Sequence, residues 1–91
     1  MMNFRMTNVV WYDGVNAYVS KFILEYDMEN NLKDESLKAL RYYLEGNGEL
    51  LKVDSLYPVN FTNIVSMEKN GTDEQKVAVQ RFRRMFFDED E

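Results

Sequence analysis

Apolar and polar residues alternate over residues 4–12, and this segment ends in an uninterrupted apolar run at residues 9–12. A period of two in a segment rich in β-branched and aromatic residues predicts a β-strand. Asp13-Gly14 follows at once. This pair is typical of the centre of a type I′ hairpin turn, which needs positive φ at both central residues. The chain is therefore expected to reverse at residues 13–14.

Residues 15–27 fit two periodicities. As a strand, the segment has four apolar side chains on the face that also holds Phe4, Val10 and Tyr12. These four are Val15, Ala17, Val19 and Ile23. As a helix, it has six side chains on one stripe: Val15, Tyr18, Val19, Phe22, Ile23 and Tyr26. The preceding turn and the content of β-branched and aromatic residues favour the strand.

The middle of the chain changes period. Apolar residues spaced three and four apart predict a helix over residues 34–45, capped by Asp34 and ended by a left-handed residue in Gly46-Asn47-Gly48. Residues 49–56 and 60–68 are predicted as two strands on either side of a turn at Tyr57-Pro58.

The last helix combines several local signals. Thr72 and Gln75 have the spacing of a capping box, and Asp73 and Glu74 lie in the first turn, where the helix dipole favours negative charge. Five apolar side chains share one face of this helix: Ala78, Val79, Phe82, Met85 and Phe86.

These elements predict a single α+β domain over residues 1–87 and an acidic tail at 88–91. The expected order is β-β-α-β-β-α, with two helices packed on one face of an antiparallel sheet. If residues 15–27 are helical, the order becomes β-α-α-β-β-α. The predicted core comprises Phe4, Val10, Val19, Ile23, Leu37, Leu40, Leu44, Leu51, Val53, Phe61, Ile64, Val79, Phe82 and Phe86.

The composition removes several classes of chemistry. A chain of 91 residues fits one domain. It has no cysteine and no histidine, which excludes disulfides, thiolate or imidazole metal sites and the two most versatile catalytic side chains. No phosphate-binding glycine loop is present. We therefore expect no catalytic, cofactor-binding or metal-binding residues, and a protein that is not an enzyme.

The formal net charge of −5 is unevenly distributed. We name as the acidic rim five carboxylates that follow one another closely: Glu25, Asp27, Glu29, Asp34 and Glu35. The first three alternate, so on a strand they would form one edge-facing row. Such a row imitates nucleic-acid phosphates and would attract a basic protein. The alternative is an ordinary solvated surface.

Positive charge gathers near the end of the chain. The basic stripe comprises Lys76, Arg81, Arg83 and Arg84, with Phe87 beside them. Such a stripe could bind phosphates while the aromatic ring stacks on a base. Its alternative role is to complement the dipole of the last helix. The acidic tail, which would repel a polyanion, could fold back onto Arg81 and Arg84.

Two aromatic residues are candidate interface anchors. Trp11 and Tyr12 are adjacent on a strand, so their side chains must face opposite sides of the sheet and one of them should be exposed. Tyr42 lies outside the apolar stripe of its helix, unlike its neighbour Tyr43, and exposed aromatic residues are typical interface anchors. Trp11 or Tyr42 could seal a homodimer, although partial burial against neighbouring side chains also accounts for such residues.

The sequence therefore favours binding over catalysis. Polar residues interrupt the first residues before a signal peptide could form, and no apolar run is long enough to cross a membrane, so a cytoplasmic location is expected. The leading hypothesis is a small regulatory module that binds a larger protein. Its most specific form is an inhibitor of the bacteriophage or mobile-element type that mimics nucleic acid. Direct nucleic-acid binding through the basic stripe and a homodimeric interaction protein are the alternatives.

Overall fold

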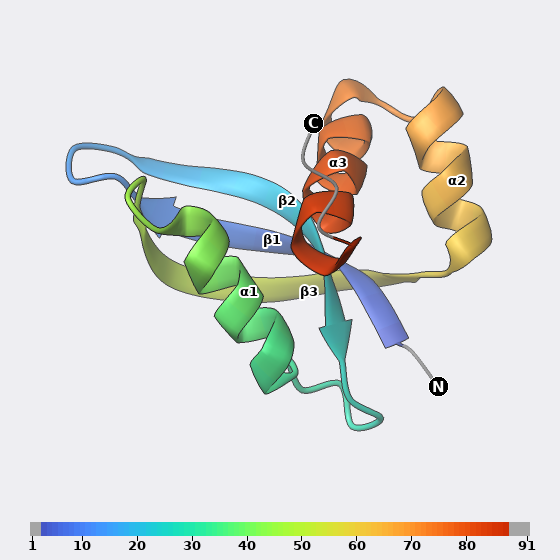
Figure 1. Ribbon diagram of the computed structural model, residues 1–91, viewed down its shortest axis with the longest axis horizontal. Coiled ribbons are helices and arrows are strands. Elements are labelled where there is room, and N and C mark those ends of the chain that lie inside the picture. Colours follow the sequence, from blue (N-terminus) through green and yellow to red (C-terminus); the bar gives the residue numbers. More distant parts are fainter. Residues whose placement is uncertain (1–2, 88–91) are drawn as a thin grey trace.

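The computed structural model describes residues 3–87, which form a three-stranded antiparallel sheet and three helices (Figure 1). The strands lie in the order β2-β1-β3, so that β1 is central. The elements in chain order are β1 (Asn3–Tyr12), β2 (Ala17–Tyr26), α1 (Asp34–Leu44), β3 (Glu49–Val59), α2 (Phe61–Asn70) and α3 (Asp73–Phe87). The α+β class and the antiparallel sheet are confirmed. The acidic tail at 88–91 lies outside the described residues.

One predicted element was wrong: residues 60–68 are not a strand but belong to helix α2. Asn60 caps this helix, since its Oδ1 accepts a hydrogen bond from the Asn63 backbone N–H at 2.8 Å. Ile64 and Met67, three residues apart, are the buried side chains of α2. The observed order is therefore β-β-α-β-α-α.

The predicted turn at Tyr57-Pro58 is also absent, because β3 runs through both residues to Val59. Proline is tolerated in a strand only where its missing N–H faces away from a neighbouring strand. Pro58 meets this condition, since β3 is an edge strand. The predicted strand over 49–56 is therefore correct but too short.

The hairpin of β1 and β2 confirms the strand interpretation of residues 15–27. Its turn is displaced by one residue, because the Asp13 N–H donates to the Asn16 carbonyl at 3.1 Å and only Gly14 has positive φ, at 102°. The Asp13 carboxylate accepts the backbone N–H groups of Asn16 and Val15, which lower its pKa below the usual range. Residues in the two strands face the predicted sides, whereas Val15 lies in the turn.

Apolar side chains are buried on both faces of the sheet. The β1–β2 register is unbroken, so alternate residues point to opposite faces. One face packs against α2 and α3 in a cluster of Phe4, Met6, Ile23, Val59, Ile64, Met67, Ala78, Val79 and Phe82. The other packs mainly against α1 in a cluster of Val9, Phe22, Leu24, Tyr26, Leu40 and Leu44. The predicted placement of both helices on one face was therefore wrong.

The predicted core is half correct. Seven of its members are buried: Phe4, Ile23, Leu40, Leu44, Ile64, Val79 and Phe82. Four are half-buried: Val10, Leu37, Val53 and Phe86. Val19, Leu51 and Phe61 are exposed instead. Val19 lies on a part of the sheet that no helix covers, Leu51 lies beside a shift in the β1–β3 register, and Phe61 lies on the outer side of α2.

The helix ends agree with the sequence except at the start of α1. Asp34 is the first helical residue there, and the capping position falls on Lys33, whose side chain makes no cap hydrogen bond. Gly46 supplies the expected left-handed residue, with φ of 82°. At α3, Thr72 and Gln75 form both hydrogen bonds of the capping box, at 3.0 and 3.2 Å.

Candidate protein-binding surface

The end of the β1–β2 hairpin has one apolar face that no helix covers. We name it the distal face and define it by Val10, Tyr12, Ala17 and Val19, which pair across the two strands as Val10 with Val19 and Tyr12 with Ala17. Val19 is 64% exposed and Tyr12 is 39% exposed. A solvent-facing surface of an antiparallel sheet is normally polar. Four neighbouring apolar positions therefore mark this surface for contact with another molecule.

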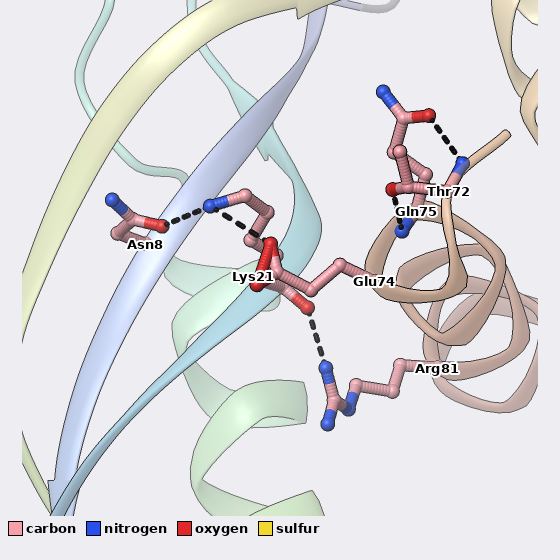
Figure 2. A network of polar contacts seen from close by, with 6 residues as sticks. All are labelled: Asn8, Lys21, Thr72, Glu74, Gln75 and Arg81. Carbon is pink, nitrogen blue, oxygen red and sulfur yellow. Dashed lines mark hydrogen bonds and ion pairs between the residues drawn. The ribbon is translucent and has the colours of Figure 1, made fainter.

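A polar bridge separates the distal face from the buried half of the same sheet face. The Lys21 ammonium donates to Asn8 Oδ1 at 3.1 Å and forms an ion pair with Glu74 at 3.3 Å (Figure 2). Asn8 and Lys21 are paired residues of β1 and β2, and Glu74 lies in the first turn of α3. The Thr72–Gln75 capping box fixes where α3 begins, and Glu74 of its first turn takes part in this bridge.

A groove runs between β2 and the first turns of α3, next to the distal face. Its volume is about 300 Å³, and its lining comprises Val19, Ser20, Lys21, Asp73, Glu74, Val77 and Arg81. Val19 and Val77, both exposed, are the apolar parts of this lining. Asp73 forms no ion pair within residues 3–87. The groove therefore combines two apolar side chains with a carboxylate that is unpaired within that range. Its Arg81 guanidinium binds the Lys21 carbonyl and lies over the Phe22 ring.

Charged residues border the distal face on the side of β3. Lys52 pairs with Val10 across the sheet and forms an ion pair with Asp54 at 3.5 Å, while Glu49 pairs with Tyr12. β3 is therefore charged beside Val10 and Tyr12, while Leu51, Leu56 and Tyr57 are exposed elsewhere on this strand. The distal face thus consists of hairpin residues and is bordered by charged residues of β3.

The acidic rim does not form the predicted row of carboxylates. β2 ends at Tyr26, so Asp27 and Glu29 lie in a turn. Glu25 forms an ion pair with Lys33 at 3.2 Å. Asp27 accepts the backbone N–H groups of Asn31 and Glu29, and the hydrogen bond from Asn31 holds its pKa below the usual range.

The other three rim residues are exposed: Glu29, Asp34 and Glu35. The latter two lie in the first turn of α1. The expectation of a phosphate-like row was therefore wrong, because two of its three members take part in the turn after β2 rather than in a strand.

The basic stripe is not one surface either. The Arg81 guanidinium lies 4.8 Å from the Phe22 ring centroid and donates to the Lys21 carbonyl at 2.7 Å (Figure 2). Arg83 instead binds Glu68 of α2 through two hydrogen bonds, at 2.7 and 2.8 Å. The two arginines thus hold α3 to different neighbours. The remaining members, Lys76, Arg84 and Phe87, are exposed.

The two aromatic candidates lie in different settings. Trp11 is half-buried, stacks on Tyr18 at a centroid distance of 4.8 Å and donates its ring N–H to Ser20 Oγ at 3.1 Å. Tyr42 is 71% exposed on α1. Trp11 is therefore held by side chains of its own hairpin. The expected contrasts with Tyr12 and Tyr43 hold, since Tyr12 is exposed and Tyr43 packs against Phe22.

A second apolar surface lies on the outer side of α2. Phe61 is 61% exposed, Val65 is exposed one turn later, and a shallow hollow between them is otherwise lined by Thr62, Ser66 and Asn70. The strand predicted over residues 60–68 places Phe61 in the core, so this surface was not among the predicted sites. A test for helical spacing, with Ile64 and Met67 on the opposite side, would have indicated it.

The described residues were also compared with the requirements of a metal site and of a membrane-spanning helix. Within the described part of the chain, no group of three or more acidic side chains is arranged to hold a metal ion. None of the helices in residues 3–87 is long and apolar enough to span a membrane. Comparison with known proteins found no matching family model, curated protein or solved structure.

Proposed function

We propose that this chain is a protein-binding module that regulates a larger protein, and that the distal face is its contact surface. The observation that carries the proposal is the exposure of Val19 and Tyr12 at positions where the outer face of a sheet is usually polar. The absence of histidine and cysteine from the sequence favours binding over catalysis.

This surface supports the proposal better than the charged groups do. Arg81, Arg83, Glu25 and Asp27 all take part in contacts within the domain, so they offer little free charge to a partner. The distal face instead presents neighbouring apolar side chains beside a groove, the arrangement expected at the centre of a protein interface. A cytoplasmic location is part of the proposal.

Site-specific photo-crosslinking tests the proposal. A photoreactive phenylalanine analogue replaces Val19 of the distal face in one variant and Val65 of α2 in another. These residues are a matched pair, because both are exposed valines on apolar surfaces. In a lysate of the source cell, we expect a discrete protein adduct from position 19 and none from position 65. Adducts from position 65 alone, equal adducts from both, or none would overturn the proposal.

A charge substitution supplies the control for folding. Once the crosslinked protein is identified, Val19→Lys is expected to abolish its non-covalent capture in a pull-down. The same change should alter the free energy of unfolding by no more than about 0.5 kcal/mol, as for other exposed positions. Tyr42→Lys, an equally exposed change on α1, is expected to leave capture intact.

A further inference from the structure

The backbone edge of β2 is held by other elements at Lys21 and Glu25, with Ile23 buried between them, whereas residues 17–19 are exposed. The Lys21 carbonyl accepts from Arg81, and the Glu25 N–H and C=O bind Ser36 Oγ and the Lys33 N–H at 2.9 and 3.1 Å. These bonds show that residues 21 and 25 direct their backbone groups away from β1. Since strand residues two apart point the same way, Ala17 and Val19 do so too.

The outward backbone groups of Ala17 and Val19 have no hydrogen-bond partner among residues 3–87. The same stretch of β2 is apolar and lies beside the groove at α3. An open edge next to a groove is the geometry in which an extended peptide adds to a sheet.

The other edge of the sheet is built differently. The β1–β3 register shifts twice, Pro58 removes an outward N–H, and Lys52 is exposed. Bulges, proline and lysine are the features by which natural edge strands avoid pairing with other chains. Residues 17–19 of β2 have none of them, so the two edges are not equivalent.

From this contrast we propose that residues 17–19 of β2 pair with an extended segment of the partner protein, which adds as a fourth strand alongside the groove. The proposal rests on the proposed function and specifies the form of the partner. Alternate side chains of the segment would contact Val19 and Val77, so these positions should be apolar.

Charge identifies the segment further. Glu74 forms an ion pair with Lys21, and the Arg81 guanidinium is held by the Lys21 carbonyl and the Phe22 ring. Asp73 of the same groove forms no ion pair within the described residues. A basic side chain in the bound segment would complement Asp73. A second copy of this chain would bring its own net charge of −5 and be repelled, which favours a different protein as the occupant.

The test begins with selection from a displayed library of random peptides of about ten residues, a length sufficient for one added strand. We expect the selected sequences to alternate apolar and polar residues and to contain a basic residue. Apolar residues at helical spacing, or no selected sequence above background, would overturn the proposal.

Two variants at one position then separate backbone pairing from side-chain contact. Val19→Pro removes the outward N–H, at an edge-strand position of the kind where proline is found, while Val19→Ile keeps it. We expect Val19→Pro to weaken binding of the selected peptide about tenfold or more, and Val19→Ile to change it less than about threefold. Equal affinity of both variants would contradict strand pairing.

The peptide provides a second readout that does not depend on the folding of a variant. N-methylation of every second amide should abolish binding in one set of positions and leave it intact in the complementary set, because only one set faces β2. Tolerance of both sets would exclude an added strand. Asp73→Asn should weaken only peptides that carry the basic residue.

The remaining outcomes distinguish the occupants. Slowed amide exchange at Val19 that grows with protein concentration and needs no peptide would show that a second copy occupies the edge, which contradicts a different partner. If Val19→Lys abolishes capture of the cellular partner but Val19→Pro does not, the distal face still binds protein, and only the strand-pairing inference fails.

Discussion

Both ends of the sheet carry apolar residues on the same face, but helices bury them at one end and leave them exposed at the other. At the proximal end, where β1 begins, Phe4, Met6 and Ile23 are buried under α2 and α3, and the opposite face is covered by α1. At the distal end, α1 covers only one face of the sheet. On the opposite face, Val10 is half-buried and Val19 is exposed. Apolar character alone therefore does not make a core. The start of α3 at Asp73 decides which half of the sheet face is covered.

The largest expected contrast between the two ends is in stability. Phe82 is fully buried in the proximal cluster and contacts Phe4 at a ring distance of 5.1 Å. Phe82→Ala should lower the free energy of unfolding by about 3–5 kcal/mol, because it removes a large buried side chain and leaves a cavity. Val19→Ala should change it by no more than about 0.5 kcal/mol. Urea unfolding measures both, and similar losses would contradict the contrast.

The covered face of the distal end should be sensitive to a smaller change. A Cβ added at Gly48 would collide with the Trp11 ring and lie 2.9 Å from the Tyr12 carbonyl oxygen. Gly48→Ala should therefore cost about 1–3 kcal/mol, as overpacking does, and shift the fluorescence of the single tryptophan. Asn47→Ala, an exposed neighbour, is the control. Unchanged stability and emission would show that Trp11 is held loosely.

Between the two ends, Thr7 and Tyr26 form a buried hydrogen bond of 3.0 Å on the face covered by α1. Tyr26→Phe removes the hydroxyl and keeps the ring, so it should cost about 0.5–1.5 kcal/mol in unfolding free energy. Tyr42→Phe on the exposed side of α1 should cost nothing measurable. Equal effects of the two variants would contradict the assigned burial.

The smallest expected effect concerns pH and the proximal helices. The Arg83 guanidinium donates two hydrogen bonds to Glu68 and lowers the pKa of that carboxyl below its ordinary 4.5. Because the pKa is lower in the folded state, this stabilisation is complete above about pH 4.5 and is lost as the pH falls through the folded pKa.

Glu68→Gln tests this dependence. The variant should be slightly less stable than the parent at neutral pH, and the difference should shrink on acidification. Urea midpoints between neutral pH and about pH 3 measure it, across the range in which glutamate titrates. A difference that grows as the pH falls would contradict the ion pair. Exposed ion pairs are weak, so the effect should be the smallest of the four.

The sequence predicts those helices and strands whose ends and faces are marked by nearby residues, such as caps, turn glycines and a regular apolar spacing. α3 carries a capping box, acidic residues in its first turn and a continuous apolar face, and all three agree. The β1–β2 hairpin has alternating apolar residues and a glycine that adopts positive φ. Local signals of this kind act over a few residues, so no tertiary information was needed.

Helix α2 could not be identified with the same ease. Residues 61–67 place apolar side chains both two apart, as Val65 and Met67, and three apart, as Ile64 and Met67. A short segment with both spacings fits a strand or a helix. The Asn60–Asn63 capping box resolves the ambiguity in favour of the helix.

The distal face could not be predicted because its exposure depends on the whole fold. Val19 is a β-branched apolar residue on the same face of β2 as Ile23, which is buried in the core. It is exposed because α3 begins beside Lys21 and α1 lies on the opposite face of the sheet. The predicted carboxylate row failed for a related reason, since Glu25 pairs with Lys33 at the start of α1 and Asp27 binds backbone N–H groups of the turn that follows β2.

Amide hydrogen exchange of the complex with the protein captured by crosslinking tests the central claim most directly. On binding, exchange should slow at residues 17–20 of β2 and at the first turns of α3, and remain unchanged along the outer side of α2. Slowing confined to Phe61, Val65 and their neighbours, with no change in β2, would show that the uncovered end of the hairpin is not the contact surface.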